Sequence, residues 1–144
     1  MKFIRNIAFV FMALCMLGLA VPISQGSAAA FTPQSYWNGD LNYPLAFSQG
    51  GANRYVKLSS AKIEEQSKGE ITQMQTAVFS YDVVMVYGDK VTTFPYTTKV
   101  QVIDGKTYIF AKKGERWTQL SDRSFDQPQY NAALILIDHF KIAQ

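Results

Sequence analysis

Apolar and polar residues alternate with a period of two through the middle of the chain, which predicts extended strands. The clearest stretch is 71–87, where every second residue from Ala77 to Tyr87 is apolar or aromatic. Its β-branched and aromatic residues favour a strand over a helix, and we expect either one long strand or two strands joined by a bend. The same reasoning predicts further strands over 55–60, 91–103, 106–110 and 117–120.

Asp104-Gly105 is the strongest local signal in the chain, because both residues suit the positive φ angles of a two-residue hairpin turn. Such a turn pairs Ile103 with Lys106, and the pairing continues residue by residue away from the turn. Opposed residues share one face of the sheet. The pairing therefore places Lys99, Gln101, Tyr108 and Phe110 on one face, and Val100, Val102, Thr107 and Ile109 on the other.

The carboxyl-terminal segment changes to a helical pattern. Ser124–Pro128 is typical of a helix start, with Ser or Asp as the capping residue and Pro in the first turn. Apolar residues then recur at helical spacing, at Tyr130, Ala133, Leu134 and Ile137. A helix with so much apolar surface needs a partner. We therefore expect an α+β fold, an antiparallel β-meander of about five to six strands with the C-terminal α-helix packed on one face.

Residues 1–30 have the three parts of a secretory signal peptide. A basic start with Lys2 and Arg5 precedes an apolar run over 7–21, and 27–30 supply the small residues of a cleavage site. The run is shorter than the roughly 20 residues that cross a bilayer as a helix. We expect an exported protein, periplasmic, at the cell surface or secreted, that meets the membrane only through this segment during export.

The rest of the chain divides into two parts by composition. Residues 31–53 are rich in Pro, Gly, Asn and Ser, and we expect an irregular lead-in there. Residues 54–144 carry the periodic segments and are expected to form a single α+β domain.

Removal of the signal peptide changes the charge and the thiol chemistry. Loss of Lys2 and Arg5 lowers the net charge from +3 to about +1, and no basic block remains, so nucleic acid is not expected as a partner. Cys15 is the only cysteine. The apolar run continues beyond it, so we interpret it as an ordinary signal residue rather than a lipidation site. The mature domain then has no disulfide, no thiolate metal site and no nucleophilic thiol.

The titratable residues form no recognisable catalytic or metal-binding pattern. His139 is the only histidine, and the adjacent Asp138 would point about 100° away from it on a helix, poorly placed to orient the ring. Glu64 and Glu65 are adjacent, and neighbours on a strand point to opposite faces. We therefore predict no catalytic residue, no metal site and no cofactor.

The face that carries Tyr108 and Phe110 is too aromatic for a plain solvent face and too polar for a second core. One interpretation is that the lead-in folds over this face, so that Trp37, Tyr43 or Phe47 covers the two rings.

A second interpretation is that the same face is an exposed binding patch. Tyr108 and Phe110 would then anchor a ligand or protein partner, with Lys99 and Gln101 beside them. For Trp117 we weigh a place in the core against a role as a binding platform, and the core is the interpretation we favour.

The order of these parts resembles small exported bacterial surface-adhesin domains of the protein E type. The likeness lies in the signal peptide, the strand Tyr-Val-Lys-Leu-Ser-Ser at 55–60, a meander that ends in Trp-Thr-Gln-Leu at 117–120, and a final helix from about Asp126. It covers roughly 54–142. The resemblance implies an antiparallel sheet backed by one helix that works in attachment to host proteins rather than in catalysis, and it carries no functional residues over.

We expect a small exported, non-enzymatic domain that binds a protein or small ligand at the bacterial cell envelope. One alternative is an enzyme or enzyme-associated module acting on envelope polymers, for which Glu64, Asp82 and His139 are the scattered titratable groups. Another is a structural domain that associates with itself through an unpaired edge strand near Pro95, a residue that predicts an edge, a bulge or an interruption. Carboxylates converging in a cleft would favour the enzyme, and a flat aromatic face would favour binding.

Overall fold

The computed structural model describes residues 35–69, 74–123 and 125–142. The predicted signal peptide, residues 1–30, lies outside these ranges. In the part of the chain that is described, no helix has both the length and the hydrophobicity needed to cross a membrane.

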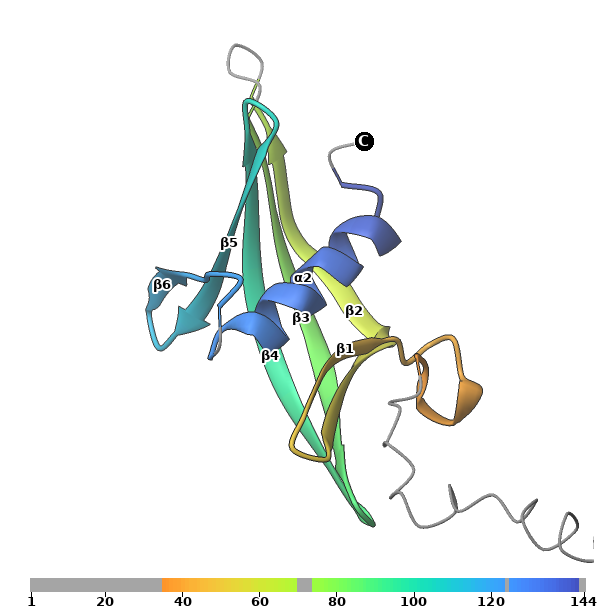
Figure 1. Cartoon of the computed structure of the whole chain (residues 1–144). Coiled ribbons are helices and arrows are strands. Elements are labelled where there is room, and N and C mark those ends of the chain that lie inside the picture. The colour runs from red at the N-terminus through yellow and green to blue at the C-terminus, as the bar shows by residue number, and fades with distance from the viewer. Residues whose placement is uncertain (1–34, 70–73, 124, 143–144) are drawn as a thin grey trace, which may run out of the picture. The chain divides into compact units, whose positions relative to one another are not determined.

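The described fold is an antiparallel sheet with one α-helix packed against it (Figure 1). Six strands neighbour one another in chain order, so the sheet is a meander. The helix crosses one face of this curled sheet, and the α+β fold predicted from the sequence is confirmed. The elements are the short 3-10 helix η2 (Trp37–Gly39), β1 (Leu45–Gln49), β2 (Ala52–Lys68), β3 (Met74–Tyr87), β4 (Lys90–Ile103), β5 (Lys106–Lys113), β6 (Arg116–Gln119) and α2 (Gln127–His139).

The long central hairpin follows from the alternating pattern of the sequence. β3 is one uninterrupted strand that pairs with β4 along its whole length, from Met74 opposite Ile103 to Tyr87 opposite Lys90. Gly88 begins the turn between them at φ +56°, a conformation that glycine adopts without steric cost. Of the two alternatives predicted for this segment, the single strand is observed.

The β4–β5 hairpin has the register that the Asp-Gly signal predicts. Asp104 and Gly105 form the turn at φ +50° and +74°. The pairing starts at Ile103 opposite Lys106 and continues through Lys99 opposite Phe110. This part of the sheet was therefore predictable to the residue.

The prediction of an irregular lead-in over 31–53 is wrong for its second half. β1 lies within it, and Gly50 and Gly51, both at positive φ, turn the chain into β2. A Gly-Gly pair is itself a hairpin signal, but the strand before it is short and only partly apolar. β2 also continues to Lys68, well beyond the expected strand at 55–60, because β3 supplies a partner over that length.

The main core lies between α2 and the face of the sheet that α2 covers. The helix contributes Ala132, Ala133 and Leu136, which are fully buried. Leu134, expected on the apolar stripe, is instead 44% exposed. Side chains two positions apart on a helix point about 200° away from each other, and Leu136 is the one that points inward. The sheet contributes Val56, Ala77, Phe79, Tyr81, Val83, Val100, Ile109 and Ala111.

The start of α2 agrees with the sequence in position but not in capping. The helix begins at Gln127 with Pro128 in its first turn. Asp126 precedes it, yet its side chain makes no capping hydrogen bond, since Oδ2 accepts one from the Ser121 N–H at 3.3 Å. Ser124, the other predicted cap, lies outside the described residues.

A buried polar network connects α2 to the sheet. The hydroxyls of Tyr81 and Thr98 are hydrogen-bonded at 2.9 Å, and Gln129 Nε2 donates to Thr98 Oγ1 at 2.9 Å. Burial raises the pKa of the Tyr81 phenol well above its ordinary value, although the bond from Thr98 opposes this shift. The phenol is therefore neutral in the folded protein at ordinary pH.

Pro95 lies in an uninterrupted strand, at a position that has the character of an edge. It pairs with Asp82 of β3, whereas the pairing of β4 with β5 ends at Thr98. The N–H of Asp82 points toward β2, where it donates to Ser60. Asp82 and Pro95 are therefore a non-hydrogen-bonded pair of the antiparallel ladder, in which the N–H position of each residue points away from the other strand. The missing N–H of Pro95 therefore faces the unpaired side of β4.

Candidate functional site

Each strand alternates its side chains between the face covered by α2 and the opposite face, which we call the outer face. Val100 and Ile109 are buried under α2, so their neighbours in β4 and β5 point outward. The register sets Lys99 opposite Phe110, and likewise Gln101 opposite Tyr108. The structure thus brings the predicted binding residues together as neighbours on one surface.

The Lys99 ammonium lies over two aromatic rings of this surface. Its Nζ atom is 4.8 Å from the ring centroid of Phe110 and 4.9 Å from that of Trp117. Such a cation–ring contact contributes about 0.5–1 kcal/mol at an exposed site. Both rings and the lysine are half-buried. We call Lys99, Gln101, Tyr108, Phe110 and Trp117 the aromatic patch.

Trp117 is the residue of the patch that sequence reasoning missed. Its assignment to the core is wrong, because it is half-buried and lies opposite Lys112, which shares the outer face with Phe110. The sequence feature that could have placed Trp117 is the turn at Gly114-Glu115. A two-residue turn there fixes the β5–β6 register and sets Trp117 on the same face as Phe110.

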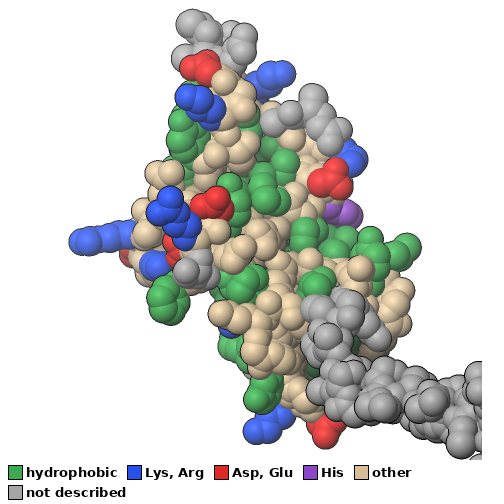
Figure 2. Space-filling view, viewed as in Figure 1, with side chains coloured by type: hydrophobic (Ala, Val, Ile, Leu, Met, Phe, Trp, Pro, Cys, Tyr) green, Lys and Arg blue, Asp and Glu red, His purple; other side chains and the backbone are tan. Residues whose placement is uncertain are grey.

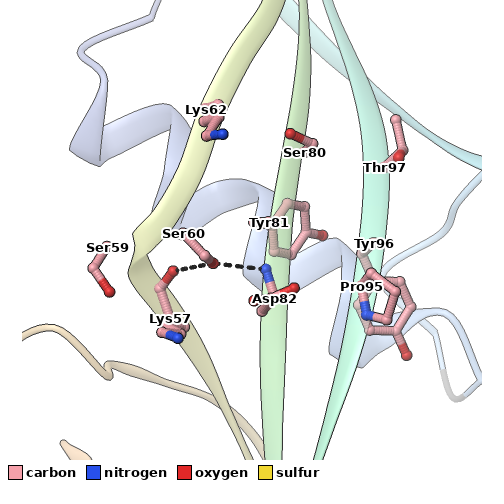
Figure 3. Close-up of a pocket in the computed structure, with 10 residues that line it drawn as sticks. All are labelled: Lys57, Ser59, Ser60, Lys62, Ser80, Tyr81, Asp82, Pro95, Tyr96 and Thr97. Atoms are coloured by element: carbon pink, nitrogen blue, oxygen red, sulfur yellow. Dashed lines mark hydrogen bonds between the residues drawn. The ribbon is translucent and has the colours of Figure 1, made fainter.

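A shallow polar depression of about 490 Å³ lies on the outer face (Figure 3). It forms where β2 bulges, since the register with β3 jumps between Lys57 and Lys62. Ser60 fills the interrupted ladder. Its Oγ donates to the Lys57 carbonyl at 2.7 Å and accepts from the Asp82 N–H at 2.9 Å, the two bonds drawn in Figure 3.

The depression adjoins the aromatic patch. Thr97 lines it, and Thr97 is the outward-facing residue next to Lys99 along β4. Figure 3 views the sheet from this side, with α2 behind the strands. The patch and the depression therefore form one continuous surface on the outer face.

Lysines outnumber carboxylates on the outer face. Among the described residues, the three carboxylates of this face lie on the β2–β3 side, where Glu64 accepts a hydrogen bond from Ser80, Glu65 is opposite the outward-facing Val78, and Asp82 lines the depression. The outward strand positions of β4 to β6 carry lysines and no carboxylate. The lysines of the outer face are Lys57, Lys62, Lys99, Lys106 and Lys112.

Trp37 and Tyr43 of the lead-in lie over a different region of the outer face, whereas Phe47 lies on the helix-covered side. Trp37 contacts Tyr43 edge to face, with ring centroids 5.2 Å apart, and stacks on Tyr55 at 6.4 Å. Tyr55 belongs to β2, at the far side of the sheet from β5. These contacts place Trp37 and Tyr43 on the β2 side rather than over Tyr108.

His139 lies apart from the other two titratable groups considered for an enzyme. Glu64 is near Asp82, because it accepts a hydrogen bond from Ser80, the neighbour of Asp82 on the outward side of β3. Glu64 and Asp82 lie on the outer face, whereas His139 is on α2, on the opposite side of the sheet (Figure 2). The His139 ring contacts Phe140, with centroids 4.8 Å apart. Within residues 35–69, 74–123 and 125–142, no group of His, Cys, Asp and Glu is arranged to hold a metal ion.

The helix-covered side has a second depression, of about 570 Å³, near the start of α2. Arg54 lies 5.9 Å from the ring centroid of Phe47 there, and Phe125 forms part of its wall. Phe125 is 99% exposed, so neighbouring side chains do not hold it in place. The aromatic patch is the better-formed surface, because the Lys99 ammonium contacts two of its rings.

Comparison of the chain with protein-family models, with curated proteins and with solved structures finds no match. The resemblance to adhesin domains of the protein E type therefore remains a prediction from the sequence.

Proposed function

We propose that this protein is a small exported, non-enzymatic domain of the bacterial cell envelope that binds a protein or other ligand through the aromatic patch. The observation that carries the proposal is the position of Lys99, whose ammonium lies against Phe110 and Trp117. Among the described residues Lys99 has no ion-pair partner. A half-buried cation with no partner charge, framed by aromatic rings, is suited to an incoming ligand.

The alternative of an enzyme acting on envelope polymers has weaker support. The depression beside the patch has a single carboxylate in its wall, Asp82, in the company of Lys57 and Lys62. Glycoside hydrolysis uses a pair of carboxylates at about 5–9 Å. Glu64, the carboxylate next to Asp82, is hydrogen-bonded to Ser80 and does not line the depression. The geometry supports binding over catalysis.

Retention of cell-envelope extract on the immobilised protein tests the proposal. Tyr108→Ala and Phe110→Ala are expected to lose at least about tenfold in affinity for the retained material, since truncating a central aromatic residue of an interface costs about 2 kcal/mol or more. The comparison is made with variants whose melting temperature shows that they are folded.

Tyr87→Ala is the matched control for this experiment. Tyr87 is 56% exposed, but it lies at the end of β3 and alternates with Val86 and Val84, so its ring belongs to the helix-covered face. This variant should retain the same material as the wild type. Unchanged retention by Tyr108→Ala and Phe110→Ala would contradict the assignment of the patch.

A further inference from the structure

We propose that the ligand of the aromatic patch is an anionic polysaccharide, a sugar chain that carries carboxylate groups. This inference rests on the proposed function and specifies the class of its ligand. The outer face offers lysines, which pair with carboxylates, beside amides and hydroxyls, which pair with sugar hydroxyls.

On the outward side of β5, two lysines flank two aromatic residues. Lys106, Tyr108, Phe110 and Lys112 alternate along the outward side of the strand, and both lysines are exposed. Strand geometry separates the two lysine Cα atoms by about 20 Å, with Lys99 of β4 beside the aromatic residues. Cations spread over this length match an extended chain with repeated negative charges better than a single small anion.

The polar groups between these cations suit a ligand rich in hydroxyls. Gln101 is opposite Tyr108 and Gln119 is opposite Phe110, with Thr97 farther along β4. Amide and hydroxyl side chains both donate and accept hydrogen bonds, as sugar hydroxyls do. The anionic chain would follow β4 to β6, because Glu64 and Asp82 make the β2–β3 side less favourable for it.

Two other anionic polymers fit this surface less well. Single-stranded nucleic acid binds by stacking bases on open ring faces, whereas Lys99 already occupies a face of Phe110 and of Trp117. An extended acidic peptide commonly adds to the edge of a sheet through backbone hydrogen bonds, whereas the patch lies on the face of the sheet. A sugar chain needs neither open ring stacks nor an unpaired edge.

Titration calorimetry with alginate, a polymer of uronic acids, tests the inference, with dextran as the neutral polymer. The wild type should bind alginate and not dextran, and the affinity should fall between about 0.05 M and about 0.5 M NaCl because salt screens exposed charges. Lys112→Gln should weaken alginate binding about threefold. Lys99→Met, which keeps the aliphatic stem against the rings, should weaken it about tenfold.

Lys113→Gln is the matched control. Lys113 adjoins Lys112 and is likewise exposed. It faces the other side of the sheet, where it lines a depression with Leu120 and Pro128. Its substitution removes the same charge and should leave alginate binding unchanged. Unaltered melting temperatures for the three variants establish that the fold is retained.

Four results would overturn the inference: no binding of alginate, binding of dextran equal to that of alginate, equal losses in Lys112→Gln and Lys113→Gln, or tighter binding of polyglutamate or oligothymidylate than of alginate. The retention experiment with Tyr108→Ala distinguishes a wrong ligand class from a wrong binding surface. If Tyr108→Ala loses envelope material while alginate does not bind, the patch remains the binding surface and only the ligand class is wrong.

Discussion

Lys99 and Tyr81 represent two ways in which this sheet accommodates a polar side chain. Lysine side chains usually bury the aliphatic stem and keep the ammonium in water. Lys99 places its ammonium against Phe110 and Trp117 instead, on the outer face. Tyr81 is buried on the other face, where its hydroxyl is satisfied by Thr98. The first arrangement leaves a charge that has no ion-pair partner among the described residues, and the second joins the core of the sheet to α2 through Thr98 and Gln129.

The buried phenol of Tyr81 should make stability depend on alkaline pH. Its pKa in the folded state is raised by burial, whereas in the unfolded chain it titrates near the ordinary value of about 10. The contribution of the neutral Tyr81 phenol to the free energy of unfolding is therefore fully present below about pH 10. As the pH rises above that value, the free energy of unfolding should fall by up to about 1.4 kcal/mol per pH unit. Urea unfolding from neutral to alkaline pH should show this decline in the free energy of unfolding.

Tyr81→Phe should reduce that decline, while burial of Tyr55, whose pKa is also raised, leaves part of it. Tyr87→Phe is the control, because Tyr87 is largely exposed. An alkaline slope that is the same in the wild type and in Tyr81→Phe would refute the role given to this residue.

At the scale of elements, α2 is held to the sheet by both apolar and polar contacts. Leu136 is fully buried among the core residues. Asn131 Nδ2 donates to the Ala46 carbonyl of β1 at 2.9 Å, and Gln129 reaches Thr98 of β4. These bonds fix the direction in which the helix crosses the strands.

Leu136→Ala and Leu134→Ala form a matched pair for the packing of α2. The first should lower the free energy of unfolding by about 2–5 kcal/mol, because it leaves a cavity under the helix. The second should change it by less than about 1 kcal/mol, since Leu134 is 44% exposed. Chemical denaturation measures both, and similar losses in the two variants would show that the helix faces are assigned wrongly.

Local signals allowed the prediction of the hairpins whose turns are short and specific. Asp104-Gly105 gave the correct partners of Lys99 and Gln101, because the turn type fixes the register. β1 and the extension of β2 could not be predicted in the same way. Their residues are polar and exposed in part, so the alternation of apolar and polar residues is weak there. They become strands mainly through pairing with the next strand along the chain.

The residues of the predicted patch could be placed on one face for the same reason that the hairpin could be predicted. Tyr108 and Phe110 follow from the β4–β5 register, whereas Trp117 needed a second register to be placed beside them. A large aromatic residue on a short terminal strand is more often part of a core. Trp117 is placed on the outer face only when the alternation of inward and outward side chains is followed from β5 into β6.

At the scale of the whole molecule, the two faces of the sheet differ in what they carry. One is covered by α2 and provides the core, whereas the other carries Trp37 of the lead-in on its β2 side and the aromatic patch on β4 to β6. The outer face also carries more lysines than carboxylates. We infer that α2 and the buried network hold the sheet rigid so that the patch is presented preformed.

Of the tryptophans, one lies at the β2 side of the outer face and the other lies in the aromatic patch, which allows a direct test of the central claim. The chain has two of them, Trp37 on the lead-in and Trp117 in the patch, so protein labelled with 5-fluorotryptophan gives two ¹⁹F resonances. Trp37→Phe assigns them. On addition of solubilised envelope extract, the Trp117 resonance should shift or broaden before that of Trp37. A response at Trp37 with Trp117 unchanged, or no response from either, would contradict the claim that the aromatic patch is the binding surface.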